Sequence, residues 1–310
     1  MRYELDCFIK RIYFLILLFM VISLIVGCVT FQVRGKKQTG AFYPLDSIRE
    51  LTRLTADLSP ESKPVISPNG QILAFVSEKH GENDIFISDT MAKNHRQITL
   101  SKSSDNNPAW TPDNKSILFD SARLGFGAIF KKNLDQERIT YQVVARGAND
   151  FAPDVSPNGK AIVFGSLTSG IESLWIATID GANLTQIGEG IFPNWSPDGE
   201  KILFISLKGG NSDVWLVNHD GSNLTQITVD IAEDIDPSWS PDGNKIVFSS
   251  NRTGNFDIWV LDLKADRLTQ LTHHPGNDKN PDWSPDGEYI YFDSLRDENL
   301  DIWRMIPVLE

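Results

Sequence analysis

A four-residue turn motif, Ser-Pro-Asp-Gly or a close variant, recurs six times and constrains this chain more than any other feature. The copies begin at Ser67, Thr111, Ser156, Ser196, Ser240 and Ser284. Successive copies are separated by 44, 45, 40, 44 and 44 residues. Self-similarity at a fixed period of this length indicates a fold assembled from copies of one unit.

A second motif follows each turn at a constant distance. It is an Asp-Ile-Trp-like triplet that starts 17 residues after the first residue of the turn in all six copies. The triplets begin at Asp84, Ala128, Ser173, Asp213, Asp257 and Asp301. The constant spacing indicates that the same two strands lie between the motifs in every copy.

Each unit contains four short segments typical of β-strands. Residues 245–249 (KIVFS) are rich in β-branched residues and follow a Pro-Asp-Gly turn, 257–261 form the next segment, and 268–272 (LTQLT) another. The innermost segment lies around Pro237 to Trp239. Four strands in a period of 40–45 residues are typical of a β-propeller blade, and no segment shows the 3.6-residue period of helical repeats. The sequence therefore predicts an all-β fold, a six-bladed β-propeller.

The ends of the repeat region predict how the propeller closes. The sixth unit ends near Met305 without its outer Leu-Thr-x-Leu-Thr strand, whereas residues 50–55 (ELTRLT) supply a copy before the first unit. We expect this N-terminal strand to complete the last blade, which removes the open edge. Residues 49–310 are thus predicted to form a single propeller domain.

The N-terminal region has the pattern of an export signal. Basic residues precede an apolar run at 12–26, which ends in Gly27-Cys28 and resembles the lipobox of bacterial lipoproteins. We expect a signal peptide at 1–27, lipid attachment at Cys28 and a linker at 28–48. Two alternatives stay open: an uncleaved helix, because 22 uncharged residues at 12–33 are long enough to span a bilayer, and ordinary cleavage.

Both main interpretations predict a membrane-tethered protein of the bacterial cell envelope. Val29 is not the Asp associated with retention in the inner membrane, so the periplasmic face of the outer membrane is favoured. The formal net charge of −12 argues against a nucleic-acid partner. The only two cysteines, Cys7 and Cys28, lie in the first thirty residues and leave the repeats without a disulfide or cysteine metal site.

The repeats resemble those of the TolB-type β-propeller family. The resemblance rests on the motifs Pro-x-Trp-Ser-Pro-Asp-Gly, Asp-Ile-Trp and Leu-Thr-Gln-Leu-Thr and covers residues 49–306. It implies a non-catalytic, protein-binding propeller whose partner is an envelope protein such as a peptidoglycan-associated lipoprotein. The sequence departs from TolB in its lipobox and in the absence of the additional N-terminal α/β domain. Similar repeats precede the hydrolase domain of prolyl-oligopeptidase-type peptidases, but no Gly-x-Ser-x-Gly motif occurs here.

Five acidic residues, here called the acidic ring, stand three positions before the repeated innermost proline. They are Glu61, Asp105, Asp150, Asp234 and Asp278, and the remaining copy, the fourth, has Gly190 in a shortened loop. We expect these positions to form a ring at one mouth of the central channel, where they would bind a cationic ligand, Ca²⁺ or a basic partner segment. The alternative is that each carboxylate braces its own loop. A basic series is expected to brace turns rather than neutralise the ring: Lys79, Arg123, Lys208, Arg252 and Arg296.

The aromatic residues and histidines give weaker indications. All eight tryptophans occupy two repeat positions, as expected for packing between sheets, with carbohydrate stacking as the alternative. His273 and His274, near Asp278, would be the start of a transition-metal site, although adjacent histidines on a polar loop are commonly only solvated. We therefore predict no catalytic residue, metal or cofactor. The alternative function is a propeller enzyme or sensor that acts on a glycan, peptide or small ligand at the channel mouth.

Overall fold

The computed structural model describes residues 48–136 and 139–309. The predicted signal peptide at 1–27, the lipid attachment site Cys28 and the linker up to residue 47 lie outside these residues. Within the described ranges the structure consists of 24 strands and one short 3₁₀ helix, η1 (Leu207–Gly209). None of the helices in these ranges has the length and apolar character that crossing a membrane requires.

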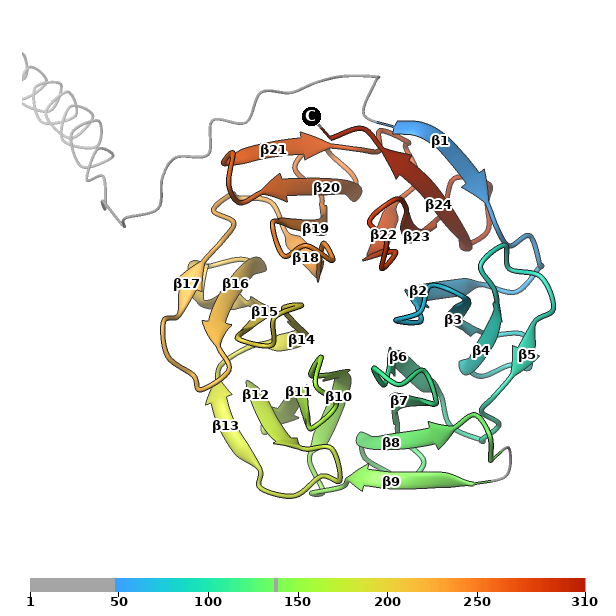
Figure 1. Cartoon of the computed structure of the whole chain (residues 1–310), viewed down its shortest axis with the longest axis vertical. Helices are drawn as coiled ribbons and strands as arrows, with labels where there is room; N and C mark the ends of the chain where they lie inside the picture. The colour runs from blue at the N-terminus through green and yellow to red at the C-terminus, as the bar shows by residue number, and fades with distance from the viewer. Residues whose placement is uncertain (1–47, 137–138, 310) are drawn as a thin grey trace, which may run out of the picture. The chain divides into compact units, whose positions relative to one another are not determined.

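The strands form six four-stranded antiparallel sheets, which confirms the six-bladed propeller (Figure 1). The innermost strands are β2 (Glu61–Ile66), β6 (Asp105–Trp110), β10 (Asn149–Val155), β14 (Ile191–Trp195), β18 (Asp234–Trp239) and β22 (Asp278–Trp283). The second strands are β3 (Ile72–Ser77), β7 (Ser116–Ser121), β11 (Ala161–Thr168), β15 (Lys201–Ser206), β19 (Lys245–Ser250) and β23 (Ile290–Ser294).

The two outer layers follow the same order. The third strands are β4 (Asp84–Asp89), β8 (Ala128–Asn133), β12 (Ile171–Thr178), β16 (Asp213–Asn218), β20 (Asp257–Asp262) and β24 (Asp301–Pro307). The outermost strands are β5 (Arg96–Gln97), β9 (Thr140–Val144), β13 (Thr185–Gly188), β17 (Thr225–Gln226) and β21 (Arg267–Gln270), with β1 (Ile48–Arg53) in the last blade. We number the blades one to six from β2 to β24.

The N-terminal strand closes the ring as predicted. β1 pairs antiparallel with β24, and Leu51 lies opposite Met305 (Figure 1). The Arg53 guanidinium donates to the buried carboxylate of Asp301 at 2.6 Å. The two ends of the described chain therefore share one sheet, and the propeller has no unpaired blade edge at this junction.

The repeated Ser-Pro-Asp-Gly motif forms the turn between the first two strands of each blade. In the fifth blade the Ser240 hydroxyl donates to Asp242 at 2.6 Å and accepts from the backbone N–H of Lys245 at 2.9 Å. Gly243 has φ +67°, a conformation that glycine adopts without steric cost. The motif recurs because the same turn has to be built six times.

The hydrophobic core lies between neighbouring blades. Each second strand contributes one fully buried phenylalanine: Phe75, Phe119, Phe164, Phe204, Phe248 and Phe292. In one cluster, Leu203 and Val214 of the fourth blade pack against Trp239 and Trp259 of the fifth. Tryptophans at both repeat positions therefore pack sheet against sheet.

Candidate functional site

The structure places four members of the acidic ring inside ion pairs. Asp105, Asp150, Asp234 and Asp278 have no exposed side-chain surface. In the fifth blade one guanidinium nitrogen of Arg252 donates to both carboxylate oxygens of Asp234, at 2.8 and 2.9 Å, and its Nε donates to Ser250 at 2.8 Å. This is a charge-assisted pair in which a second nitrogen of the guanidinium group is also bonded.

The same arrangement recurs in the second and sixth blades, where Arg123 bonds Asp105 and Arg296 bonds Asp278. The expectation that the basic series leaves the ring unneutralised is wrong for these residues. The strand register explains why: Asp234 lies opposite Ser250, and the arginine two residues later folds back onto the carboxylate.

Each of these arginines also stacks on an aromatic side chain of its own blade. The guanidinium carbon lies 4.6 Å from the ring centre of Phe130, 4.9 Å from that of Trp259 and 4.7 Å from that of Trp303. Cation–π contact of this kind adds to the ion pair and fixes the orientation of the planar guanidinium. The carboxylate, arginine and aromatic ring together tie the first, second and third strands of a blade.

The third blade reaches the same result by a different route. It lacks a basic residue 18 positions after Asp150, and Arg146, four residues before Asp150, donates to its carboxylate at 2.6 Å instead. Arg146 also donates to Ser166 at 3.0 Å and lies 4.0 Å from the ring centre of Trp175. Sequence analysis missed Arg146 because it stands outside the repeated offset.

The two remaining blades depart from the pattern. In the fourth blade, a Cβ atom at Gly190 would lie 2.4 Å from Cδ2 of Phe204, so the shortened loop leaves no space for a side chain. In the first blade, Glu61 is buried, but Lys79 bonds Asp57 at 2.9 Å instead of Glu61. The ring is thus four neutralised carboxylates, one glycine and one glutamate with different surroundings.

None of the five acidic residues lines the central cavity described below. The ion pairs of Asp105, Asp234 and Asp278 lie within their own blades, as the bracing alternative expects. Direct binding of a cationic ligand by the ring as a whole stays a prediction.

A cavity of about 520 Å³ lies on the axis of the propeller. Its wall includes the prolines of the six Ser-Pro-Asp-Gly turns, which reach the surface, and residues of all six innermost strands. Each innermost strand carries a bulge where its register against the second strand shifts. The bulges turn one residue of each strand toward the cavity.

We call these six residues the cavity ring. Each stands directly before the repeated proline and has φ between 49° and 53°: Lys63, Asn107, Ala152, Phe192, Asp236 and Asn280. The backbone is the same in all six blades, but the side chains include a cation, an anion, two amides, a methyl group and an aromatic ring. Sequence analysis missed these positions because they share no residue type.

Lys63 connects several members of the cavity ring. Its Nζ donates to Oδ1 of Asn107 in the next blade. The same nitrogen lies 5.7 Å from the ring centre of Phe192, which belongs to the fourth blade. Because the first and fourth blades face each other in a six-membered ring, the Lys63 side chain extends across the cavity.

Buried carboxylates surround Lys63. Asp120 accepts from Asn107 at 2.6 Å and from the backbone N–H of Ala152 at 2.9 Å. Asp293 accepts from the backbone N–H of Lys63 at 2.9 Å and from Asn280 at 2.7 Å. Burial raises the pKa of Asp293 to about 7 and also raises the pKa of Asp120 and Asp236, although the charge of Lys63 opposes each shift.

A second set of polar side chains in the cavity wall joins one blade to the next. Asp154 accepts from the backbone N–H of Trp195 at 2.6 Å, and Asp282 accepts from that of Ile66 at 3.0 Å. Burial raises the pKa of Asp154 to about 7 and that of Asp282 to about 6. These bonds link the third blade to the fourth and the sixth to the first.

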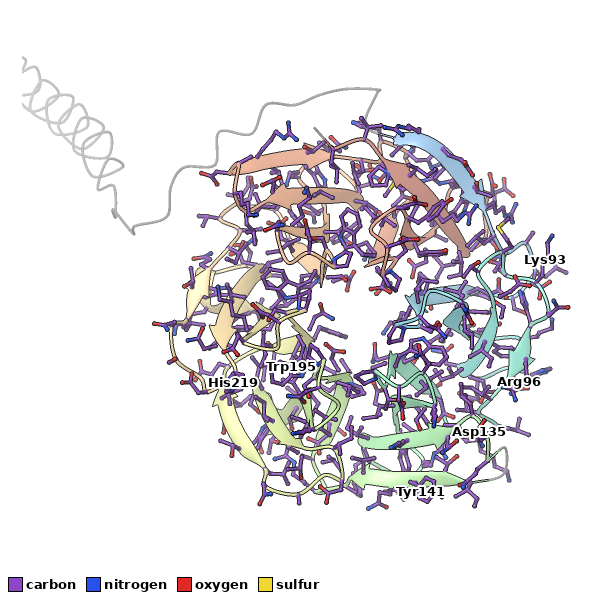
Figure 2. All side chains as sticks on the ribbon, in the orientation of Figure 1. Lys93, Arg96, Asp135, Tyr141, Trp195 and His219 are labelled. Carbon is purple, nitrogen blue, oxygen red and sulfur yellow. The ribbon has the colours of Figure 1, made fainter. Side chains whose placement is uncertain are left out.

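The predicted histidine pair does not assemble a metal site with Asp278. Asp278 is bound by Arg296 and Ser294, and Nδ1 of His274 accepts from the backbone N–H of Gly276 at 3.0 Å. Burial lowers the pKa of His273. Another histidine, His219, lies beside Trp195, with 6.4 Å between the ring centres (Figure 2).

Comparisons with known proteins agree with this fold. Residues 56–192 match the TolB beta propeller domain, and residues 210–308 match the Tricorn protease N-terminal beta propeller domain. The Tol-Pal system protein TolB of Wolinella succinogenes is 32% identical over 107 residues, which cover 34% of this chain and 25% of that protein. The chain thus matches about a quarter of the length of this curated relative.

Solved structures extend the likeness over most of the chain. A putative TolB from Agrobacterium tumefaciens has a TM-score of 0.67 at 20% identity, covering 83% of this chain and 97% of that one. A gluconolactonase from Xanthomonas campestris has a TM-score of 0.65 at 14% identity, covering 84% and 91%. At these identities the likeness shows the fold alone. The chain is a six-bladed β-propeller. Within that class, its repeats at residues 56–192 are similar to those of the TolB beta propeller domain.

Proposed function

We propose that this chain is a membrane-tethered, non-catalytic protein-binding propeller of the bacterial cell envelope. Binding would take place at the central cavity. The observation that carries the proposal is the cavity ring, where one repeated backbone position presents six side chains of mixed chemistry. Recognition of an asymmetric partner needs such variation, whereas a purely structural position in a repeat needs none.

The chemistry of the cavity favours a protein segment as the ligand. Tryptophan and proline side chains supply apolar surface, while Lys63 and Asp236 supply charges of opposite sign. Pockets of this kind, apolar with a few polar groups, fix the orientation of an inserted chain. The TolB relatives are proteins of the Tol-Pal system, so an envelope lipoprotein associated with peptidoglycan is the partner we propose.

The anchor completes the proposal. Lipid attachment at Cys28, after removal of residues 1–27, would hold the propeller at the membrane, with the periplasmic face of the outer membrane favoured. The gluconolactonase likeness is one of fold, and it transfers no reaction to this chain.

Binding of the purified peptidoglycan-associated lipoprotein from the same organism tests the proposal. The full-length chain in detergent would be titrated as wild type, as Lys63→Ala and as Phe192→Ala. We expect each cavity variant to lose at least tenfold in affinity, because each removes a side chain from the shared wall. Lys93→Ala changes an exposed lysine at the outer rim and serves as the control that keeps full affinity (Figure 2).

Equal affinity of all four proteins would exclude the cavity as the binding site. Absence of binding by folded wild-type protein would exclude the proposed partner.

A further inference from the structure

The first blade differs from its neighbours in how the ring carboxylate is surrounded. In the four other blades that carry a ring carboxylate, an arginine reaches it from 18 residues after it or from four residues before it. The first blade has Lys79 and Asp57 at these two positions, and they bond each other at 2.9 Å. Glu61 therefore has a second carboxylate nearby and no arginine partner among the described residues.

Glu61 is buried with an oxygen left unbonded. The residue is only 1% exposed, and its Oε2 has no hydrogen-bond partner in the part of the chain that the structure describes. Burial raises the pKa of Glu61 to about 7, and the charges of Asp57 and Asp301 add to the shift, while a hydrogen bond from Thr55 opposes it. A buried carboxylate oxygen without a donor is costly, and such atoms are rare in native proteins.

His95 packs against the phenylalanine whose equivalent in the second blade contacts the arginine. Its ring centre is 5.2 Å from that of Phe75, and in the second blade the guanidinium carbon of Arg123 is 5.4 Å from the ring of the equivalent Phe119. Nε2 of His95 lies 2.6 Å from the carbonyl oxygen of Ala92. In the neutral tautomer whose Nε2 donates this bond, the lone pair is on Nδ1, the form in which imidazole binds metals.

The three side chains converge on one point. One donor atom each from Asp57, Glu61 and His95 lies within 4.8 Å of the other two. We propose that these residues bind a divalent transition-metal cation, with Zn²⁺ as the representative ion. In this blade the cation would supply the positive charge that arginine supplies in the others.

The chemistry of the three ligands favours one class of metal ion. Two carboxylates and one imidazole are ligands that Zn²⁺ accepts, and three protein ligands leave a position for water. Ca²⁺ and Mg²⁺ prefer sets made of oxygen alone, so we expect them to bind more weakly here. The ammonium group of Lys79 competes with the metal because it bonds Asp57.

Calorimetric titration of the full-length chain with Zn²⁺, in detergent, tests the site. We expect Glu61→Gln and His95→Gln each to remove one bound Zn²⁺ per chain or to weaken its binding at least tenfold. We expect Lys79→Met to tighten binding severalfold, because Asp57 is then free of its competitor. Zn²⁺ should raise the thermal unfolding midpoint of the wild type and leave that of Glu61→Gln unchanged.

The same set of variants controls for binding of Zn²⁺ to other side chains. Cys7, Cys28, His273 and His274 are present in every variant, so their contribution cancels in each difference. His219→Gln removes a surface histidine and should bind as the wild type does. Identical titrations of wild type and folded Glu61→Gln would overturn the proposal. If Glu61→Gln does not fold, His95→Gln is compared with the wild type instead, because His95 is only partly buried. Identical titrations of these two proteins would then overturn the proposal.

Discussion

The acidic ring lies on five of the six innermost strands and the cavity ring on all six, but the two rings are repeated in opposite ways. At the acidic ring an acidic residue is repeated in five blades, and four of these side chains are buried in ion pairs. At the cavity ring the backbone conformation is repeated and the side chains differ. Repetition of a side chain thus marks a contact that each blade needs, whereas repetition of the backbone alone leaves the side chain available for recognition.

The largest effect is expected from breaking one pair of the acidic ring. Arg252→Met leaves the fully buried Asp234 without its cation, and the arginine itself is only 8% exposed. Removing one partner of a buried pair costs about 3–5 kcal/mol. We expect a loss of this size in the free energy of unfolding, measured by urea denaturation.

The double variant Asp234→Asn/Arg252→Met is the matched control. It removes both charges, so it should be more stable than Arg252→Met alone. A loss below about 1 kcal/mol in the single variant would mean that the pair does not brace its blade.

The acidic pairs were within reach of sequence reasoning, and the cavity ring was not. Arg252 follows Asp234 by 18 residues, and Arg123 and Arg296 follow their aspartates by the same number. Two series with one offset, on adjacent strands of a predicted hairpin, are a signal of contact. The prediction that the basic series braces turns overlooks that signal.

The cavity ring gives no comparable signal. Lys63, Ala152 and Phe192 share only the proline that follows, and a residue before proline is ordinarily extended rather than left-handed. Only the bulged register of the innermost strands shows that these side chains meet. The convergence of His95 on Glu61 is equally invisible in sequence, because His95 lies in an outer turn of a single blade.

The pH dependence of the free energy of unfolding is a further difference between the two rings. Around the cavity, Asp154 and Asp293 have a pKa of about 7 and Asp282 one of about 6, well above the value near 4 of an unfolded chain. The folded state therefore binds more protons between these values. The stabilisation of the folded state by these bound protons is fully present below pH 4 and is lost as the pH rises through 6 and 7. His273, whose pKa is lowered by burial, acts in the opposite direction.

We expect the free energy of unfolding to fall by on the order of 3 kcal/mol between pH 5.5 and pH 8. Asp293→Asn should flatten this slope, since an amide does not titrate. Urea denaturation at pH 5.5, 6.5 and 8 gives the measurement. Asp242→Asn is the control, because the pKa of Asp242 is lowered to about 2 and lies outside the window. An unchanged slope in Asp293→Asn would show that Asp293 does not titrate between pH 5.5 and pH 8.

The smallest effect is expected from exchanging one member of the cavity ring for another. Ala152→Asn places at φ 49° the residue that positions 107 and 280 already hold in the same conformation. Asn tolerates this region well, the backbone N–H of residue 152 still donates to Asp120, and the added atoms face the cavity. We expect the free energy of unfolding to change by less than about 0.5 kcal/mol, measured by urea denaturation.

Ala152→Val is the contrasting control, because a β-branched residue at this φ costs about 1–3 kcal/mol. Together the two variants test whether the stability of the cavity ring depends on its backbone conformation or on the identity of its side chains. A loss in Ala152→Asn as large as that in Arg252→Met would mean that the cavity ring is as structural as the acidic ring. The variation among its side chains would then reflect six separate packing solutions. The argument that places partner binding at the cavity would lose its support.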